Sequence, residues 1–565
     1  MALHRYDWIL ALITIAFCAS AFGNGANDVA NSYATSVAAR TLTMPQVGIL
    51  SIITEFVGAV ALGSRVTDTI KNGIIDIDRF EGRPGVLMLA MACAEFGSAT
   101  WLFVATKLGF PVSTTQTIVG AFVGVGLASQ ASISWAWEDG SVSQTAASWG
   151  IAPCIAAGFS AIIYLVLKYT VLERKDSLKW AMRLIPAYLS VTAAILALFI
   201  VIEAPTAPSL EEFGAGKACG IVFGVLAGAL IISYVFFMPY FKRRLIKNDA
   251  RLRFYHIPLG PLLNKEDPWL YFPGSADGPA VKDYYENAYK KDDTKQQVQA
   301  LPQSVMSTPD TLGPGDVEKG LESKLAPLEP HQRPTGIIEP EDRWIKPLKH
   351  LPIYHPRRLW GFVKYFFLQG VSRDCVSHNS EHVLEAHSRA KQYDNRVEHL
   401  WTYAQVASAM MMSIAHGSND VSNAVGPWAA TYSTWKESRV NTEADTPIFI
   451  LVVAGLLLGT GFWFFGFHII RSLGNKVTQL SPTRGFATEL GAAITVLLAS
   501  RLGLPVSTTQ CLTGALLGVA LMNYDLKAVN WRQMAFIFGG WVLTLPCAGL
   551  ISGLLMLMSL NTPHF

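Results

Sequence analysis

The sequence predicts an all-α polytopic membrane protein with about 12 transmembrane segments arranged as two inverted repeats. Three observations predict this fold: the composition is apolar, the apolar residues form long segments, and one set of motifs occurs twice. Of the 565 residues, 51% are hydrophobic and 15% are charged. A soluble globular protein carries roughly 25% charged residues. The mean hydropathy of +0.31 also fits membrane spans around polar loops.

The apolar segments are long enough to cross a membrane. A spanning helix needs about 20 mostly apolar residues. Segments of this kind lie at 7–31, 45–64, 86–107, 111–130, 150–170, 184–203, 216–240, 400–428, 446–470, 485–501, 505–523 and 533–559. We retain the first as a span and not as a cleaved signal peptide, because the residues just after the possible cleavage site Ala19-Ser20-Ala21 recur in mid-chain.

Two pairs of these segments are joined by very short turns that contain glycine and proline. They are 86–107 with 111–130, and 485–501 with 505–523. Each pair is therefore either two spans or one broken or re-entrant element.

The chain divides into two transmembrane halves, 1–240 and 400–565, around a polar central loop over 241–399. Within this loop, 283–343 is rich in proline, glycine and charged residues, which predicts disorder. Residues 343–369 mix aromatic and basic side chains. They form either an amphipathic segment on the membrane surface or an ordinary loop that ends in a short packed helix.

Loop charges predict the orientation of the chain. Basic residues cluster after the fifth and seventh segments, so the positive-inside rule places the N-terminus outside and the central loop in the cytoplasm. The basic residues that follow the second segment argue against this orientation; they are Arg65, Lys71, Arg79 and Arg83.

The strongest signal is an internal repeat. Residues 25–31, GANDVAN, return as residues 417–423, GSNDVSN. Residues 108–116, LGFPVSTTQ, return as residues 502–510, LGLPVSTTQ. The repeats span about 7–130 and about 400–523. Because an odd number of spans separates equivalent points, we expect the two copies to run in opposite directions, as in many secondary transporters.

The Asn-Asp motifs place a carboxylate inside an apolar segment in each copy. An ionised aspartate at the centre of a membrane helix costs roughly 2.5–3.5 kcal/mol, so it needs a partner. Neither motif contains lysine or arginine, and oxygen ligands suit a hard cation such as sodium. The expected sodium ligands are Asn27, Asp28, Asn31, Asn419, Asp420 and Asn423. Helix unwinding at the nearby glycines would add carbonyls. The alternative is hydrogen bonding between helices.

The Pro-Val-Ser-Thr-Thr-Gln motifs are typical of helix starts. Proline is tolerated in the first helical turn, and serine or threonine can cap it. A helix N-terminus offers free N–H groups and a partial positive charge, which suit a tetrahedral oxyanion. The expected anion ligands are Ser113, Thr114, Thr115, Ser507, Thr508 and Thr509. The alternative is plain capping of a broken helix.

Three further acids stand alone in apolar stretches: Glu55, and the repeat-related pair Glu95 and Glu489. We expect them to coordinate cations or handle protons, with structural hydrogen bonding as the alternative. His416 replaces Asn24 ahead of the second motif, and a lone histidine is more often packed or hydrogen bonded than a proton relay.

Several other functions are disfavoured. The net charge of +3 and the absence of a basic cluster with interleaved aromatics argue against a nucleic-acid partner. The seven cysteines form no CxxC pair, and no metalloprotease, hydrolase or P-loop motif is present, so we expect neither a cofactor nor enzymatic activity.

At these repeated motifs the chain resembles the inorganic phosphate transporter family, the sodium-coupled type III phosphate symporters. The resemblance covers both apolar halves but not the central loop. Gln116 and Gln510, together with the long loop, are similar to the fungal branch. The resemblance implies that Asp28 and Asp420 serve sodium and phosphate transport, that the lone glutamates matter for transport, and that the Ser-Thr-Thr residues bind phosphate.

The expected function is therefore sodium-coupled phosphate symport by alternating access in the plasma membrane. The partners are phosphate, sodium and the lipid bilayer, and a homodimer remains open. Proton-coupled phosphate or sulfate uptake is the nearest alternative. A transporter-like nutrient receptor that signals through the central loop is another, and a membrane-embedded enzyme with paired acids is a third.

Overall fold

The computed structural model describes residues 4–63, 67, 74–75, 77–137, 141–203, 214–265, 280–285, 338–377, 380–440 and 446–562. Apart from one isolated bridge between Ile75 and Ile133, the regular structure of these residues is helical. Most of the predicted disordered stretch, 283–343, lies outside them.

Each segment that the sequence predicted to span is helical. The N-terminal half contains α1 and α2, which are nearly continuous, then α3, the pair α5 and α6, and α7, α8 and α10. Their bounds are Asp7–Asn27, Val29–Ala38, Met44–Leu62, Pro84–Leu108, Thr114–Ser129, Val142–Leu167, Ser177–Glu203 and Ala215–Ile232. Short helical turns extend α7 to Leu172, and they extend α10 through α11 (Met238–Phe241) to Ile246.

The C-terminal half begins with the 43-residue α16 and ends with α21. Its helices are α16 (Asn395–Glu437), α17 (Ile448–Phe465), α18 (Phe467–Val477), α19 (Pro482–Arg501), α20 (Thr508–Leu521) and α21 (Trp531–Asn561). Between the halves, the central loop contributes α14 (Pro356–Leu368), α15 (Glu381–Arg389) and several short turns, including η6 (Phe254–Asn264).

Eight helices in the described part of the chain are long and apolar enough to cross a membrane. The remaining expected spans are α16 and α19, which carry more polar residues, and the shorter α6 and α20, of 16 and 14 residues. A full crossing takes about 17–25 residues. Each short helix therefore pairs with a longer one, α5 or α19, and begins part-way along the bundle.

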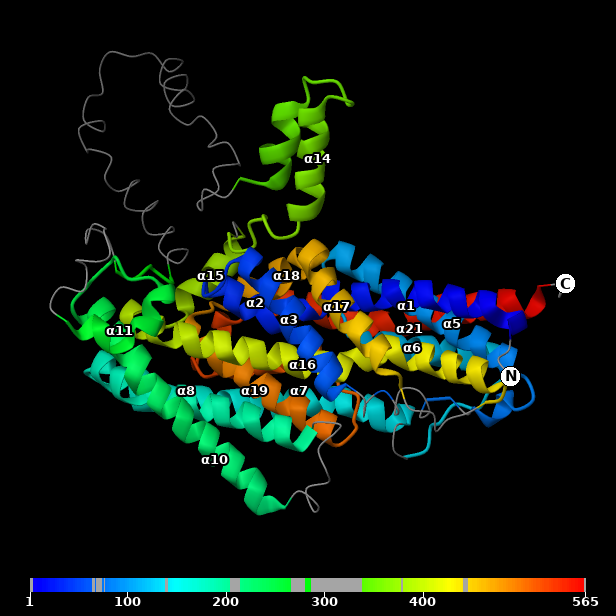
Figure 1. Ribbon diagram of the computed structural model, residues 1–565, viewed down its shortest axis with the longest axis horizontal. Helices are drawn as coiled ribbons and strands as arrows, with labels where there is room; N and C mark the ends of the chain where they lie inside the picture. The colour runs from blue at the N-terminus through cyan, green and yellow to red at the C-terminus, as the bar shows by residue number, and fades with distance from the viewer. Residues whose placement is uncertain are drawn as a thin grey trace, which may run out of the picture.

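The two copies run in opposite directions. Figure 1 shows α1 and α2 leading away from the end of the bundle that holds both termini, whereas α16 leads back toward it. Helices of one copy pack on helices of the other, and the equivalent pair is also present in each case. Helix α6 packs on α21 and its counterpart α20 on α7, while α1 packs on α17 and its counterpart α16 on α3. The inverted repeat is thus interlocked, and it extends beyond the motifs to include α7 and α21.

Close helix contacts in both copies depend on glycine. A Cβ on Gly124 of α6 would lie 2.0 Å from the carbonyl oxygen of Gly549 on α21. The repeat-related Gly518 of α20 has the same relation to Ala157 of α7, at 2.3 Å. Inside a membrane there is no hydrophobic driving force between helices, so association depends on close packing. Small residues such as glycine allow backbones to approach this closely.

We expect Gly124→Ala to destabilise the protein by about 1–3 kcal/mol, because the added methyl must push α6 away from α21. Gly158→Ala on α7 is the matched control, since a Cβ there meets no atom within 4 Å. Thermal unfolding in detergent should show a lower Tm for the first variant alone. Equal Tm values would contradict the close packing of α6 on α21.

Candidate functional site

The two predicted helix starts meet inside the bundle. Ser113 caps α6 by accepting from Gln116 N at 3.1 Å, and Ser507 caps α20 by accepting from Gln510 N at 3.2 Å. The two serines therefore do cap their helices, as the alternative interpretation of these motifs predicted. The N-terminal tip of each of these two helices also contacts the tip of the other.

Threonine hydroxyls join the two tips. Thr115 Oγ1 donates to the carbonyl of Val506 at 3.1 Å, and Thr509 Oγ1 donates to the carbonyl of Val112 at 2.9 Å. All six Ser-Thr-Thr side chains are buried. The structure thus brings the two sets of predicted anion ligands into one small region with two helix N-termini.

The motif aspartates are bonded to these tips. Asp28 lies between α1 and α2, where Thr114 donates to its Oδ2 through N at 3.2 Å and Oγ1 at 2.8 Å. Thr509 of the other tip donates to its Oδ1 at 2.9 Å. Asp420 accepts from Thr508 at 2.7 Å. Both carboxylates are buried, so these donors replace water around them.

The unwinding expected at the glycines does not occur, because Gly23 and Gly25 lie within α1 and Gly417 lies within α16. The α-helical pattern is interrupted at Asp28, where Asn31 N bonds to Asp28 O in a tighter turn at 2.9 Å. By contrast, α16 continues through Asp420. Both aspartates are bonded to a tip, and Asp420 in addition lies 3.2 Å from His416, one turn earlier on its own helix.

The four motif asparagines divide into two kinds. Asn27 donates to Thr106 Oγ1 and to the Phe110 carbonyl, and it accepts from Val112 N, so it fixes the turn before α6. With its amide oriented to suit its neighbours, Asn419 fixes the equivalent turn through Ser500 and Val506. These two side chains therefore position the tips.

Asn31 and Asn423 point their amides at the tips and keep free oxygens. Asn31 Nδ2 donates to Thr509 Oγ1 at 2.7 Å, and Asn423 Nδ2 donates to Thr114 Oγ1 at 3.0 Å. Their buried Oδ1 atoms have no hydrogen-bond partner among the described residues. A buried amide oxygen without a donor is costly, and a hard cation is a suitable partner for it.

Sequence reasoning missed two further oxygens of this kind. The side-chain Oε1 atoms of Gln116 and Gln510 are also buried without a partner among the described residues. The signal was available, because both glutamines end the repeated Pro-Val-Ser-Thr-Thr-Gln motif.

His416 joins two acids from different helices. Its Nδ1 lies 2.7 Å from Glu55 Oε2 on α3, and its Nε2 lies 3.2 Å from Asp420 Oδ2. Ser413 also donates to Glu55, at 2.5 Å. Ligand atoms of Asp28, His416 and Asp420 all lie within 4.8 Å of one another. The histidine, which the sequence predicted to be packed or hydrogen bonded, is hydrogen bonded and lies within the acidic cluster.

The pair Glu95 and Glu489 occupies two different environments. Glu489 accepts from Ser36 and Ser408 at 2.7 Å each, from Gln405 at 3.4 Å, and from Thr35. Both carboxylate oxygens of Glu95 are buried with no hydrogen-bond partner among the described residues. Neither acid is bonded to the Asn-Asp motifs.

The sequence explains this asymmetry. The two copies of the first motif are 392 residues apart, and this offset relates each donor around Glu489 to a residue of the other copy. Gln405 and Ser408 correspond to Ile13 and Ala16, and Thr35 and Ser36 correspond to Pro427 and Trp428. None of these can supply a hydroxyl, and Trp428 Nε1 already donates to Thr14. Glu489 is thus surrounded by hydrogen-bonding side chains that Glu95 lacks.

We expect Glu489→Gln to lower the Tm clearly more than Glu95→Gln does. The first change disturbs a group that accepts four hydrogen bonds, and a typical bond contributes about 0.5–1.5 kcal/mol. The second replaces a carboxyl whose oxygens have no hydrogen-bond partner among the described residues, so it breaks no such bond. Thermal unfolding of the two variants beside the wild type measures the difference, and a larger loss for Glu95→Gln would contradict it.

Known proteins are similar in sequence to this chain over nearly its whole length. The phosphate transporter family matches residues 24–552. The phosphate-repressible phosphate permease pho-4 of Neurospora crassa is 38% identical, and the alignment covers 100% of this chain and 99% of that protein. Human sodium-dependent phosphate transporter 2 is 27% identical, with 98% of each chain covered.

A solved structure agrees with the fold. The chain described as the sodium-dependent phosphate transporter superposes with a TM-score of 0.63 at 22% identity, and the match covers 98% of this chain and 100% of that one. The family match, the full-length relatives and the duplicated motifs agree: this chain belongs to the phosphate transporter family.

Proposed function

We propose that the protein carries inorganic phosphate into the cell together with sodium, by alternating access across the plasma membrane. One observation carries the proposal: two buried aspartates are bonded to the hydroxyls of two opposed helix starts, beside Asn31 and Asn423, whose amide oxygens lack donors. Anion donors and cation acceptors therefore alternate within one buried region. That arrangement suits an anion and cations that travel together.

Phosphate would bind at the two tips. Thr114, Thr115, Thr508 and Thr509 now donate to carboxylates and carbonyls, and phosphate oxygens can accept the same hydrogens. The N-termini of α6 and α20 add partial positive charge at the same place. Because the tips touch in this conformation, binding requires them to separate.

Sodium would bind at the Asn-Asp motifs. Asp28 and Asp420 supply the charge, and Asn31, Asn423 and the tip glutamines supply neutral oxygens. Asn27 and Asn419, which we expected to be ligands, are better placed as positioning residues. Glu55 would act through His416. A cation here offsets the repulsion between a phosphate and the two aspartates, which gives coupling a direct electrostatic cause.

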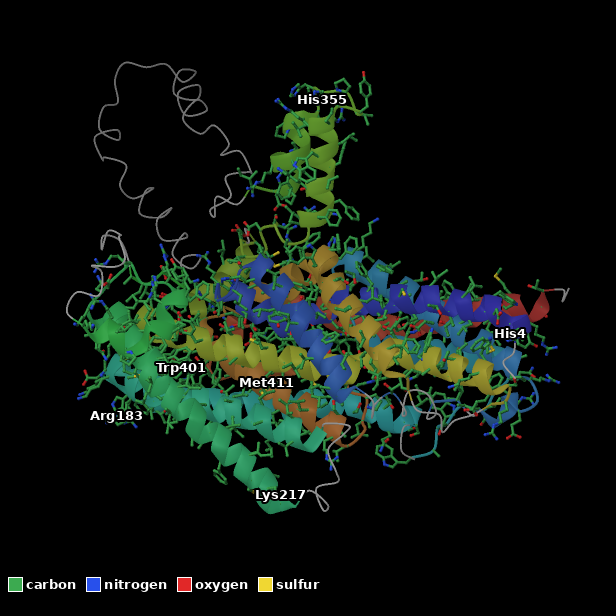
Figure 2. All side chains as sticks on the ribbon, in the orientation of Figure 1. His4, Arg183, Lys217, His355, Trp401 and Met411 are labelled. Carbon is green, nitrogen blue, oxygen red and sulfur yellow. The ribbon has the colours of Figure 1, made fainter. Side chains whose placement is uncertain are left out.

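The proposed orientation places the central loop in the cytoplasm. Figure 2 shows His4, near the N-terminus, and Arg183, in the first turns of α8, at opposite ends of the bundle. The positive-inside rule assigns the Arg183 end to the cytoplasm. Inverted repeats around a shared site then provide two alternative access routes.

Radiolabelled uptake into proteoliposomes tests substrate and coupling ion together. A sodium gradient should drive phosphate uptake, and unlabelled sulfate should compete weakly. Equal uptake under a proton gradient without sodium would replace sodium coupling by proton coupling. Sulfate accumulation in place of phosphate would contradict the assigned substrate.

A further inference from the structure

The helix α14 projects away from the bundle. Figure 1 shows α14 and the turns before it rising from one side of the bundle, across the direction of the spans. Figure 2 places His355, which caps the start of α14, at the tip of the projection. A helix in this direction lies parallel to the plane of the membrane.

The base of α14 is fixed at the end of a membrane span. Trp463, near the last turn of α17, donates from Nε1 to the Phe367 carbonyl at 2.7 Å. The Phe366 and Phe464 rings lie 5.4 Å apart. Val371, just beyond α14, contacts the position of Gly48 in the first turns of α3. Helix α14 therefore leaves the bundle where α17 ends and α3 begins, at the boundary of the apolar layer.

One face of α14 is packed. Gly361 lies against the backbone of Trp344 and the side chain of Leu348, and Tyr365 donates to Glu341 at 2.9 Å. The opposite face is apolar and exposed, with side chains 38–59% accessible: Leu359, Trp360, Phe362, Val363, Phe366 and Phe367. So large an aromatic patch on a 13-residue helix marks an interaction surface.

The charge of this projection identifies the kind of surface that it fits. Between residues 341 and 369, six basic residues stand against two acidic ones. Arg357 and Lys364, two helical turns apart, are exposed at the edge of the apolar face. Lys364 Nζ lies 5.7 Å from the Trp360 ring, so the cationic and aromatic groups are adjacent. Aromatic and basic side chains together are the pattern of an interfacial helix that binds anionic lipids.

We propose that α14 lies in the interfacial layer of the membrane, with its aromatic face among the acyl chains and its basic edge on anionic phospholipid headgroups. Its direction, the position of its base and its charge all favour a lipid surface over a second protein. The anchor would hold the end of α17 and, through it, α18. Asn475 of α18 donates to the Ala38 carbonyl at the end of α2, so the anchored segment adjoins the broken helix of the site.

Photocrosslinking of the full-length protein in vesicles tests this placement. Benzoylphenylalanine at Phe366 should give lipid adducts, which mass spectrometry identifies. The same residue at Tyr524 is the matched control, because Tyr524 is 67% exposed in the connection between α20 and α21, beside charged side chains. Retained phosphate uptake shows that each labelled protein is folded.

The expected result is a phospholipid adduct at Phe366 and little or none at Tyr524. In phosphatidylcholine vesicles that contain phosphatidylserine, the adducts should be enriched in phosphatidylserine severalfold. Changing Lys349, Arg357 and Lys364 to glutamine should remove that enrichment. Crosslinks from Phe366 to a second copy of the chain, or no adduct at all, would overturn the proposal. Equal adducts with both lipids in the unmodified chain would overturn its anionic part.

Discussion

Replacing Asp28 by asparagine is expected to reduce sodium-driven phosphate uptake by about 100-fold or more. Asp28 accepts three hydrogen bonds from the two helix tips, and bonds to a buried charge contribute about 1.5–3 kcal/mol each. Asparagine keeps the shape but removes the charge that a sodium ion would balance. Initial uptake rates in proteoliposomes, at equal amounts of folded protein, measure the effect.

Asp7→Asn is the matched control for this change. Asp7 begins the same helix, α1, and accepts from Trp435 Nε1 at 2.8 Å, but it lies at the exposed end of the bundle. Its loss should leave uptake within about twofold, as for most surface substitutions. Asp28→Asn with near-normal uptake would remove Asp28 from the coupling site.

Thr509→Val should have the second-largest effect, a loss of uptake of about 10-fold to 100-fold. This hydroxyl shares its one hydrogen between Asp28 Oδ1 and the Val112 carbonyl, each 2.9 Å away, and its oxygen accepts from Asn31. Valine has nearly the same shape, so the change leaves three buried polar groups without this partner at little steric cost. Each such group costs about 1–3 kcal/mol.

The control for Thr509→Val lies one turn later on α20. Thr513 is also buried, but its hydroxyl donates only back along its own helix, to the Thr509 carbonyl at 2.7 Å. Thr513→Val should therefore keep most of the uptake. Similar rates for the two variants would mean that contact between the tips does not matter for transport.

Much of the fold could be predicted from the sequence because membrane spans leave a simple signal. About 20 apolar residues in a row predict a helix, and a duplicated motif separated by an odd number of spans predicts inversion. The interlocking of α6 with α21 and of α20 with α7 could not be predicted. It depends on close glycine contacts such as Gly124 with Gly549, which join segments far apart in the chain.

The sequence could predict which residues form the candidate site, but not the role of each residue within it. The motifs placed Asp28, Asp420 and the six tip residues in one region, because repeated polar residues in apolar segments are rare. The roles of the asparagines depend on the turns that face them: Asn27 fixes the Phe110 turn, whereas Asn31 keeps a free oxygen. The link from His416 to Glu55 could not be inferred, since it joins residues 361 positions apart.

Equilibrium binding of labelled phosphate to the purified protein, in sodium and in choline, tests the central claim most directly. If phosphate at the helix tips and sodium at the Asn-Asp motifs share one site, each must raise the affinity for the other by the same factor. We predict at least about 10-fold tighter phosphate binding in sodium, equivalent to about 1.4 kcal/mol, and loss of that gain in Asp28→Asn. Equal affinity in sodium and choline for the wild type would contradict the account.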